Sequence, residues 1–522
     1  MKRIFNISFI LALVLGVSSC NMNLRPYSVI DPENALESYA DAVKLANGFN
    51  IQIRSLAVGD EVYAPELQSD FFHATPDFGN RGGDLYRWEF TSGSGYPESL
   101  WAGCYAAIAN ANYFIDKASK IEERVAADEA FAETWTDEEL EYLKGHIGEA
   151  YFLRAYAHYI LADRYCATYS ESGANAPDSG IPYVTVYAPT SDKEKYPARE
   201  TLKDTFTNIM NDLGEAEKTI ALVNEAEAGS NYITLDAVKA LRARVALACQ
   251  DYAQAIQDAT SIINSGTYAL VGSVAALQKL WVNDDADSEV ILQSFVALST
   301  ENPGTNNYGY IGYNASKDIY APDFVPAKWL VDLYDDNDYR KEVFFMETPL
   351  TLSAGESTPV YIFSKFGGNP ALQTGPTDIN YRNAPKPFRL AEQYLIAIEA
   401  YVYSGVAGGE KAASDLLNEL KSNRIDGWQT KEYTAAEIKS EVKDERVREL
   451  VGEGFRLSDL KRYGAGMERT ECQNSAVVSM PGSSSTELLK KSAEDFRFVW
   501  PIPTAETDAN PKIKQNPGYN NL

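Results

Sequence analysis

Three glutamates spaced four residues apart are the side chains best arranged to do chemistry. Glu445, Glu449 and Glu453 would share one face of a helix, because positions i and i+4 are neighbours on a helical surface. Their Cβ atoms would lie about 5–6 Å apart, which is close to the carboxylate separation of a retaining glycoside hydrolase. The spacing therefore raises the hypothesis of a hydrolase that uses Glu449 and Glu453 as its paired carboxylates.

Basic residues around these glutamates argue against catalysis. Arg446, Arg448 and Arg456 lie about one turn away and would hold the carboxylates ionised, whereas a general acid needs a raised pKa. Regular spacing and mutual pairing instead favour a clamp that joins the C-terminal helices to the rest of the fold. Gly452 and Gly454 interrupt the run, and we expect them to break the helix or to allow a close backbone approach.

Two other segments combine aromatic rings with amides, carboxylates and glycines. Residues 69–98 and 302–326 are expected to be long loops, because Gly, Pro, Asp and Asn interrupt any regular period. Sugar C–H faces stack on rings while sugar hydroxyls need fixed polar partners, so such loops are typical of a carbohydrate site. For any single tyrosine, packing against the scaffold is the alternative. The predicted ligand-binding residues are Phe71, Phe72, Asp77, Phe78, Arg81, Trp88, Tyr96, Asn307, Tyr308, Tyr310, Tyr313 and Tyr320.

The chain offers little material for a metal site or for nucleophilic catalysis. The acidic runs at 284–289 and 335–338 do not complete the spacing of an EF-hand, so we interpret them as solvated turns. Three histidines cannot supply a histidine-rich site. The four cysteines other than Cys20 are scattered and show no CxxC pattern, and we interpret them as buried hydrophobic residues, with two disulfides as the alternative. We expect no metal and no cofactor.

Charge and the N-terminal segment limit where the protein acts. A formal net charge of −27 argues against nucleic acid or an anionic membrane surface as the main partner. Lys2 and Arg3 precede an apolar run at 7–17, which is typical of a secretory signal. The following LGVSSC resembles a bacterial lipobox, with an ordinary signal peptide as the alternative. We predict a signal peptide at 1–19, lipidation of Cys20 and a lipidated tether at 20–34.

Helical periodicity dominates the remaining chain, so the predicted fold class is mainly α. Residues 234–249 and 252–265 carry small alanines on facing sides and resemble a tetratricopeptide helix pair, although no strict repeat is visible. We predict one domain over 35–522, composed of a tetratricopeptide-like helical scaffold at 35–270, an irregular loop-rich ligand-binding region at 271–384, and C-terminal helices with a Pro-rich strap at 385–522. The predicted helices are 35–58, 100–120, 136–165, 201–223, 234–249, 252–265, 389–403 and 411–424.

Three C-terminal segments resemble the signature of the SusD/RagB family, the nutrient-binding outer-membrane lipoproteins of Bacteroidetes-type bacteria. They read RLAEQYLIAIEAY, DERVRELVGEGFRLSDLKRYG and FVWPIPTAETDANPKIKQNPGY. Upstream, the segments LWAGCYAAIANAN, GEAYFLRAYAHYILADRY followed by GIPYV, and ARETLKDTFTNIMNDLGEAE are similar to the family as well. The segments follow the family's order over nearly the whole mature chain, which is more specific than any single motif.

The resemblance implies a function as well as a fold. Members of this family do not catalyse; they bind oligosaccharide and deliver it to a SusC-like TonB-dependent transporter in the outer membrane. The resemblance also implies a lipid anchor in that membrane, a position facing the cell exterior and no cofactor. Because the ligand loops are the family's most variable part, no binding residue is carried over by motif. Binding of a peptide or another non-sugar nutrient is the alternative, and a surface glycoside hydrolase is a remote one.

Overall fold

The computed structural model describes residues 35–286, 288–297, 301, 308–351, 357–373, 382–476, 478 and 489–519. The predicted signal peptide, Cys20 and the tether lie outside this range. No helix within the described ranges is both long and apolar enough to cross a membrane. Four 3₁₀ turns accompany the helices and strands given below: η2 (Lys193–Lys195), η3 (Ile220–Leu222), η4 (Pro370–Leu372) and η5 (Phe496–Phe498).

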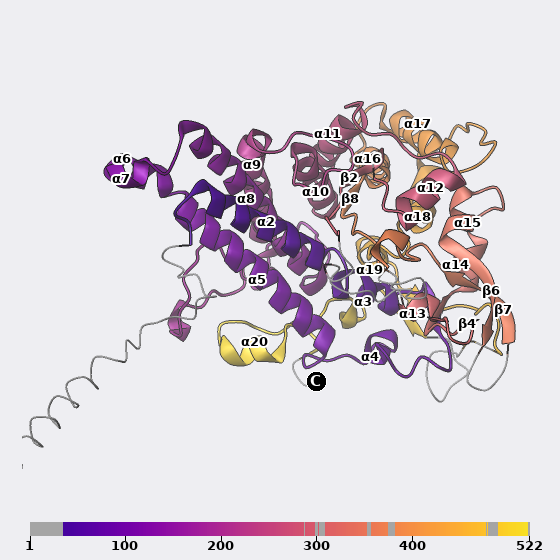
Figure 1. The fold of residues 1–522 in the computed structure, drawn as a ribbon. Coiled ribbons are helices and arrows are strands. Elements are labelled where there is room, and N and C mark those ends of the chain that lie inside the picture. The colour runs from indigo at the N-terminus through magenta and orange to yellow at the C-terminus, as the bar shows by residue number, and fades with distance from the viewer. Residues whose placement is uncertain are drawn as a thin grey trace, which may run out of the picture.

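Helices of four to twenty-nine residues build the first half of the molecule, and the longer ones agree with the predicted periodicity (Figure 1). They are α2 (Tyr39–Leu56), α3 (Asp60–Gln68), α4 (Gly83–Tyr86), α5 (Gly95–Ala118), α6 (Ile121–Ala127), α7 (Glu129–Ala132), α8 (Asp137–Tyr165), α9 (Leu202–Thr219), α10 (Leu235–Ala248) and α11 (Tyr252–Ile263). At the centre of this scaffold, α8 packs against α2, α5 and α9. Its start is set by a capping box, in which Thr136 Oγ1 accepts from the Glu139 amide and Glu139 accepts from the Thr136 amide at 2.8 Å.

The helix pair α10–α11 confirms the predicted tight hairpin. Gln250 adopts a positive φ of 64° in the connecting turn. Ala243 and Ala246 of α10 share one fully buried cluster with Ala255 and Ala259 of α11. Side chains this small let the two backbones approach closely, and α16 (Leu390–Ser404) packs against the same pair, mainly against α11.

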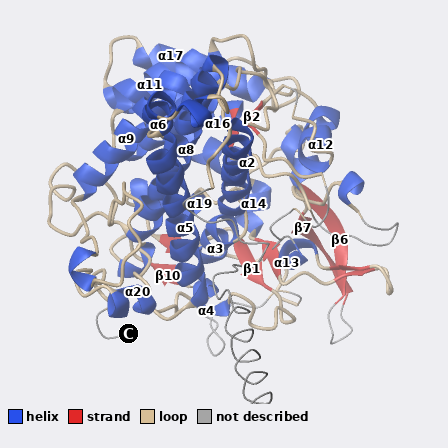
Figure 2. Ribbon diagram, turned by 60° about the vertical axis from the view of Figure 1, so that its left-hand side comes forward, coloured by secondary structure: helices blue, strands red, loops and turns tan. Residues whose placement is uncertain are grey.

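The middle of the chain is more regular than the sequence indicated. Its elements are α12 (Val274–Val282), β2 (Val290–Leu292), α13 (Tyr308–Ile311), β3 (Tyr313–Asn314), β4 (Ile319–Tyr320), β5 (Phe324–Pro326), α14 (Lys328–Asp332), α15 (Tyr339–Phe344), β6 (Phe345–Thr351) and β7 (Ser357–Phe363). Strands β3, β4, β6 and β7 form a small sheet in that order, on the side of the molecule away from α8 and α9 (Figure 2). Strands β2, β3, β4 and β5 are only two or three residues long, which is too short to show an alternating pattern.

The last part of the chain returns to helices and then crosses the scaffold. It contains β8 (Phe388–Arg389), α16, α17 (Gly409–Ser422), α18 (Ala435–Leu450), α19 (Arg456–Arg462), β9 (Met467–Glu468), β10 (Lys490–Lys491) and α20 (Thr504–Ala509). The predicted Pro-rich strap is mostly extended, with the short α20 lying beside α5 (Figure 1). Trp500 is fully buried, and its Nε1 donates to Gln68 Oε1 at 2.8 Å. Asn516 donates to the carbonyls of Tyr165 and Trp500, both at 2.8 Å.

Candidate functional site

The two ring-rich loops that the sequence singles out lie side by side. The short strand β1 (Phe72–Ala74) of the first loop pairs antiparallel with β5 of the second. The Thr75 amide donates to the Asp323 carbonyl at 2.8 Å, and the rings of Phe72 and Tyr310 have centroids 4.5 Å apart. Two segments that are more than two hundred residues apart in the sequence therefore pack against each other in one region of the fold.

Several of the predicted ligand contacts are core residues, which corrects the expectation for them. Phe71, Phe72 and Trp88 are only 1–2% exposed, and Tyr310 is 4% exposed. Side chains without free surface cannot stack on a sugar in solution. The physical reason is that this region has few long elements, so its loops must supply large rings to bury enough apolar area.

Other predicted residues keep accessible surface. Arg81 is exposed and forms an ion pair with the buried Asp323, which ties the first loop to the second. Tyr313 and Tyr320 are half-buried neighbours with ring centroids 4.9 Å apart, and we call them the tyrosine pair. Tyr313 Oη donates to Asp318 Oδ1 at 2.7 Å. Asp77, Phe78 and Tyr96 are likewise partly exposed, whereas Asn307 and the side chain of Tyr308 lie outside the described residues.

The glutamates at four-residue spacing form a buried ionic network rather than an open site. Glu449 is fully buried and accepts from Arg389 at 2.6 Å, from Arg424 at 2.9 Å and from Arg340 at 2.9 Å. Glu453 accepts from Lys365 at 2.6 Å. These bonds join α18, β8, α15 and the end of α17, so the cluster acts as the clamp that the sequence favours.

The partners in this network differ from those predicted. Arg446 pairs with Asp459 at 2.8 Å and Arg456 pairs with Asp70 at 2.7 Å, so neither holds the central glutamate. Arg448 pairs with Glu445 at 2.9 Å. Glu453 does not share a helical face with Glu445 and Glu449, because α18 ends at Leu450. The expected break at the two glycines is confirmed, since Gly452 and Gly454 turn the chain with φ of 79° and 84°.

The electrostatics of the network keep its carboxylates ionised. Burial alone would raise the pKa of Glu445, but Arg340 and Arg448 lower it from 4.5 to about 2. Burial likewise opposes ionisation of Glu449, yet Arg424, Arg389 and Arg340 hold its pKa well below the usual range. The pKa of Glu453 is lowered too, against the effect of burial, by Arg389 and Lys365. Neither Glu449 nor Glu453 can act as a proton donor near neutral pH.

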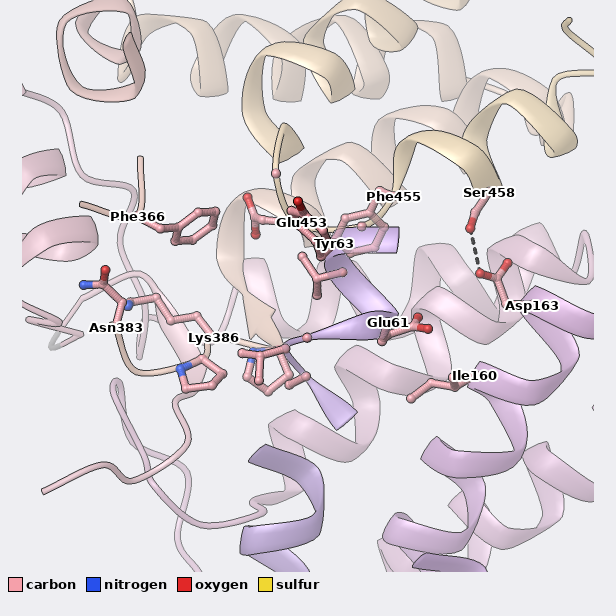
Figure 3. Close-up of a pocket in the computed structure, with 18 of the residues that line it drawn as sticks. Glu61, Tyr63, Ile160, Asp163, Phe366, Asn383, Lys386, Glu453, Phe455 and Ser458 are labelled. Atoms are coloured by element: carbon pink, nitrogen blue, oxygen red, sulfur yellow. Dashed lines mark hydrogen bonds between the residues drawn. The ribbon is translucent and has the colours of Figure 1, made fainter. Parts of the chain in front are cut away.

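A cavity of about 140 Å³ lies where the scaffold, the middle region and the Gly452–Gly454 turn meet, and we call it the junction cavity. Its lining comes from α3, the second half of α8, α10, the end of α12, α13, residues 383–387 and the turn before α19. In the view of Figure 3, Phe366, Asn383 and Lys386 lie on one side and Glu61, Asp163 and Ser458 on the other. Its aromatic lining consists of Tyr63, Tyr156, Tyr159, Trp281, Tyr310, Phe366 and Phe455.

The charged side chains that line the junction cavity have hydrogen-bond partners nearby. Arg164 donates to Glu61 at 3.0 Å, and Ser458 donates to Asp163 at 2.6 Å. Lys386 donates to Asp284 at 2.8 Å. Burial raises the pKa of Glu61 to about 8, although Arg164 acts against the shift. The cavity therefore combines aromatic rings with both hydrogen-bond donors and hydrogen-bond acceptors.

Sequence reasoning missed this cavity. Tyr156 and Tyr159 are three residues apart on α8, a spacing that is equally typical of a packed helical face. The signal that pointed here was the pair of glycines at 452 and 454. A Cβ on Gly454 would lie 3.0 Å from Val62 Cα, so the turn closes directly against α3. The remaining lining residues come from distant segments that no local pattern connects.

The described residues hold no group of three or more His, Cys, Asp and Glu side chains that could bind a metal ion. Cys104, Cys166, Cys249 and Cys472 are free thiols, and all but Cys249 are buried. Their placement agrees with the interpretation as small hydrophobic residues.

Two family models match the chain, one in each half. Residues 342–519 match the SusD family, and residues 34–247 match a family described as starch-binding and associating with the outer membrane. Together they include most of the scaffold, the three glutamates of the ionic clamp and the C-terminal strap.

Curated proteins extend the match to the whole length. The chain is 22% identical to SusD-like protein P38 of Formosa agariphila, over 99% of this chain and 100% of that protein. It is 26% identical to the starch-binding protein SusD of Bacteroides thetaiotaomicron, over 62% of this chain and 67% of that protein.

Solved structures share the fold. A SusD superfamily protein from Bacteroides thetaiotaomicron aligns with a TM-score of 0.73 at 23% identity, covering 92% of this chain and 100% of that one. A putative sugar binding protein from Bacteroides vulgatus aligns with a TM-score of 0.71 at 24% identity, covering 93% and 99%. The mainly α architecture predicted from the sequence is thus confirmed.

Proposed function

The chain belongs to the SusD/RagB family, and from that premise we propose that it captures oligosaccharide at the outer membrane and passes it on without cleaving it. The receiving partner in this proposal is a SusC-like TonB-dependent transporter. One relative, the Bacteroides thetaiotaomicron protein, is named as starch-binding, and a glycan of that general class is the ligand proposed here.

The tyrosine pair is the observation that carries the binding role. Tyr313 and Tyr320 are the predicted rings that remain accessible together, and their centroids are 4.9 Å apart. The bond to Asp318 holds the Tyr313 hydroxyl and leaves the carboxylate exposed beside the ring. Adjacent rings with a nearby carboxylate match the two needs of a sugar, which are an apolar face to stack on and acceptors for its hydroxyls.

The ionic clamp supports a role without catalysis. A glycoside hydrolase needs one carboxyl group that is protonated at working pH. In this protein Glu449 is buried and the Glu453 side chain is 11% exposed. Three arginines lower the pKa of Glu449, and Arg389 and Lys365 lower the pKa of Glu453. A test is incubation of the purified wild-type protein with the glycans that it binds; release of reducing ends would contradict the proposal.

The N-terminal sequence pattern and the family support a proposal for how the protein is anchored and where it meets its transporter. The LGVSSC segment supports processing before Cys20 and lipidation of its thiol, which would attach the protein to the outer membrane. Multiple acyl chains make such attachment stable. We propose that the protein faces the cell exterior, above its transporter.

Calorimetry on residues 21–522 against a panel of oligosaccharides tests the ligand class. We expect one or more oligosaccharides to bind and a TonB-dependent transporter to co-purify from native membranes. A panel in which peptides bind and all glycans fail would instead favour the capture of a non-sugar nutrient. Failure of both the glycan panel and the co-purification would refute the proposal.

A further inference from the structure

A surface groove of about 450 Å³ lies between α2, α8 and the segment after α9, and we call it the scaffold groove. Its volume falls within the roughly 300–1,000 Å³ of sites that bind small molecules, and a disaccharide is a ligand of that size. One face of α2 contributes Tyr39, Asn47 and Asn50, and one face of α8 contributes Tyr142, His146 and Glu149. Residues 221–225 and Tyr232 complete the lining.

Two glycines inside α8 allow the segment after α9 to lie directly against this helix. A Cβ on Gly145 would lie 2.6 Å from Val223 Cγ1, and a Cβ on Gly148 would lie 2.8 Å from Thr219 Oγ1. Glycine in a helix interior destabilises the helix by roughly 0.5–1 kcal/mol relative to alanine. The close approach that places residues 221–225 beside α8 therefore depends on residues that do not favour the helix itself.

A chain of hydrogen bonds fixes the polar side of the groove. Glu149 is only 2% exposed, and its two carboxylate oxygens lie 2.7 Å from His146 Nδ1 and 2.8 Å from Asn224 Nδ2. A carboxylate only accepts, so both nitrogens donate. His146 Nε2 lies 3.3 Å from Tyr39 Oη. The chain thus joins α2, α8 and the segment after α9, and it holds the groove in shape without a ligand.

The rings of the scaffold groove keep accessible surface, unlike those of Phe72 and Trp88. Tyr232 is 51% exposed. Tyr39 and Tyr142 are half-buried, with ring centroids 6.0 Å apart. Rings with free faces can stack on the C–H face of a sugar.

Amides on α2 supply the polar contacts that sugar hydroxyls need. Asn47 is exposed and Asn50 is half-buried. Within the part of the chain that the structure describes, no hydrogen bond engages either side-chain amide. Each amide therefore keeps both its donors and its acceptor for a ligand.

The charges of the lining favour a neutral ligand. Neither lysine nor arginine occurs among the described residues that line the groove, so an anionic ligand would meet no compensating charge. Glu149 is already bonded to His146 and Asn224, and Glu225 is exposed to water, which screens its attraction for a cation. Rings, free amides and the lack of an unscreened charge together fit a neutral sugar.

We propose that the scaffold groove binds one or two sugar units of a neutral glycan, as a second site separate from the tyrosine pair. This inference takes its ligand class from the proposed function. Neither Tyr313 nor Tyr320 is among the described residues that line the groove. Figure 1 shows α2 and α8 far from β4, which carries Tyr320. Mutations can therefore separate binding at the two sites.

The test starts from residues 21–522 with Tyr313→Ala and Tyr320→Ala, which remove the rings of the first site. Saturation-transfer NMR titrations measure binding of the neutral disaccharides maltose, cellobiose and xylobiose, with digalacturonic acid and the dipeptide Lys-Lys as charged comparisons. We expect at least one neutral disaccharide to bind this double variant with a dissociation constant on the order of 1 mM. Neither charged compound should bind as tightly.

Two further substitutions in the same background locate the binding. Tyr232→Ala removes an exposed ring and Asn47→Ala removes an exposed amide, so neither disturbs the core. Each should weaken disaccharide binding about two- to tenfold, through loss of one stacking contact or one hydrogen bond.

Tyr187→Ala is the matched control. Tyr187 is a half-buried ring of the scaffold that does not line the groove, so its loss should leave the dissociation constant within about twofold. Circular dichroism and melting temperature verify that each variant folds.

The outcomes separate this inference from the proposed function. Weakening by Tyr232→Ala or Asn47→Ala, with the control unchanged, supports the groove. Binding that neither substitution weakens, or that Tyr187→Ala weakens equally, overturns it, as does tighter binding of a charged compound. If the wild type binds glycans and the Tyr313 and Tyr320 double variant binds none, the groove fails while the proposed function stands. If the wild type binds no sugar of any length, both fail.

Discussion

Arg389 donates to Glu449 across 2.6 Å while both side chains are 1% exposed or less. This contact joins β8 to α18 across sixty residues of sequence. An ion pair so deeply buried contributes to stability only while every partner is present. A substitution at either residue should therefore lower the free energy of unfolding more than a substitution in an exposed surface ion pair does.

Substitution Glu449→Gln should destabilise the protein by about 3–5 kcal/mol, because it leaves three buried arginines without their shared carboxylate. Urea denaturation followed by circular dichroism measures the change. Glu215→Gln is the matched control, since Glu215 forms an exposed pair with Lys218 and should cost less than about 1 kcal/mol. Equal effects of the two substitutions would show that the network does not hold the fold together.

Substitution Glu66→Gln should stabilise the protein increasingly as pH rises. Burial raises the pKa of Glu66 from 4.5 to about 8, although the Gly454 amide donates to its carboxylate at 2.8 Å. A carboxyl group with a raised folded-state pKa contributes stability that is complete below 4.5 and is lost as pH rises through about 8. The shift corresponds to about 5 kcal/mol in the high-pH limit. Urea midpoints at about pH 5, 7 and 9 measure the difference, and a constant offset would contradict it.

Substitution Gly452→Ala should cost about 2 kcal/mol or more. The residue has φ of 79°, and an added Cβ would lie 2.5 Å from Phe363 Cζ. Gly214→Ala is the matched control, because Gly214 lies inside α9 with no atom within 4 Å of an added Cβ. Alanine there should stabilise the helix by about 0.5–1 kcal/mol. Thermal melts of both variants give the comparison, and a stabilised Gly452→Ala would show that the turn tolerates other conformations.

The double variant Tyr313→Ala and Tyr320→Ala should weaken oligosaccharide binding by about tenfold or more, since each stacking ring contributes about 0.5–1.5 kcal/mol. Calorimetry with the best ligand of the panel measures the loss. Tyr113 and Tyr187 form another half-buried ring pair, with centroids 5.1 Å apart, on the scaffold. Replacing them should leave affinity unchanged. A loss of affinity only in the variant of Tyr113 and Tyr187 would place the ligand-binding site away from Tyr313 and Tyr320.

Substitution Cys20→Ala should release the protein from the membrane fraction, because it removes the thiol that lipidation requires. Cell fractionation with immunoblotting measures the distribution. Cys104→Ala, at a buried free thiol, should leave the protein membrane-bound. Membrane retention of the Cys20 variant would contradict the lipid anchor.

Local patterns predicted the scaffold well, because helix capping and small-residue faces act over a few residues. Thr136 with Glu139 marks the start of α8, and Ala243 with Ala255 marks the close contact of α10 and α11. The predicted start of α2 was too early, since the helix begins only at Tyr39.

The site was harder to predict, because buried residues in loops do not recur at a regular spacing in the sequence. Phe72 and Tyr313 look alike in the sequence, yet one is 1% exposed and the other remains accessible. Long-range pairing is equally hidden: Glu449 and its partner Arg340 are 109 residues apart. The junction cavity depends on such distant contacts at almost every point of its lining.

The C-terminal strap links folding to the order of synthesis. Trp500 and Asn516 satisfy groups on α3 and α8, among them Gln68 Oε1 and the Tyr165 carbonyl. Gln68 and Tyr165 are synthesised hundreds of residues before the strap. These hydrogen bonds of the scaffold can therefore form only after the last segment of the chain is present. A chain that lacks this segment therefore leaves Gln68 Oε1 and the Tyr165 carbonyl of the scaffold without these donors.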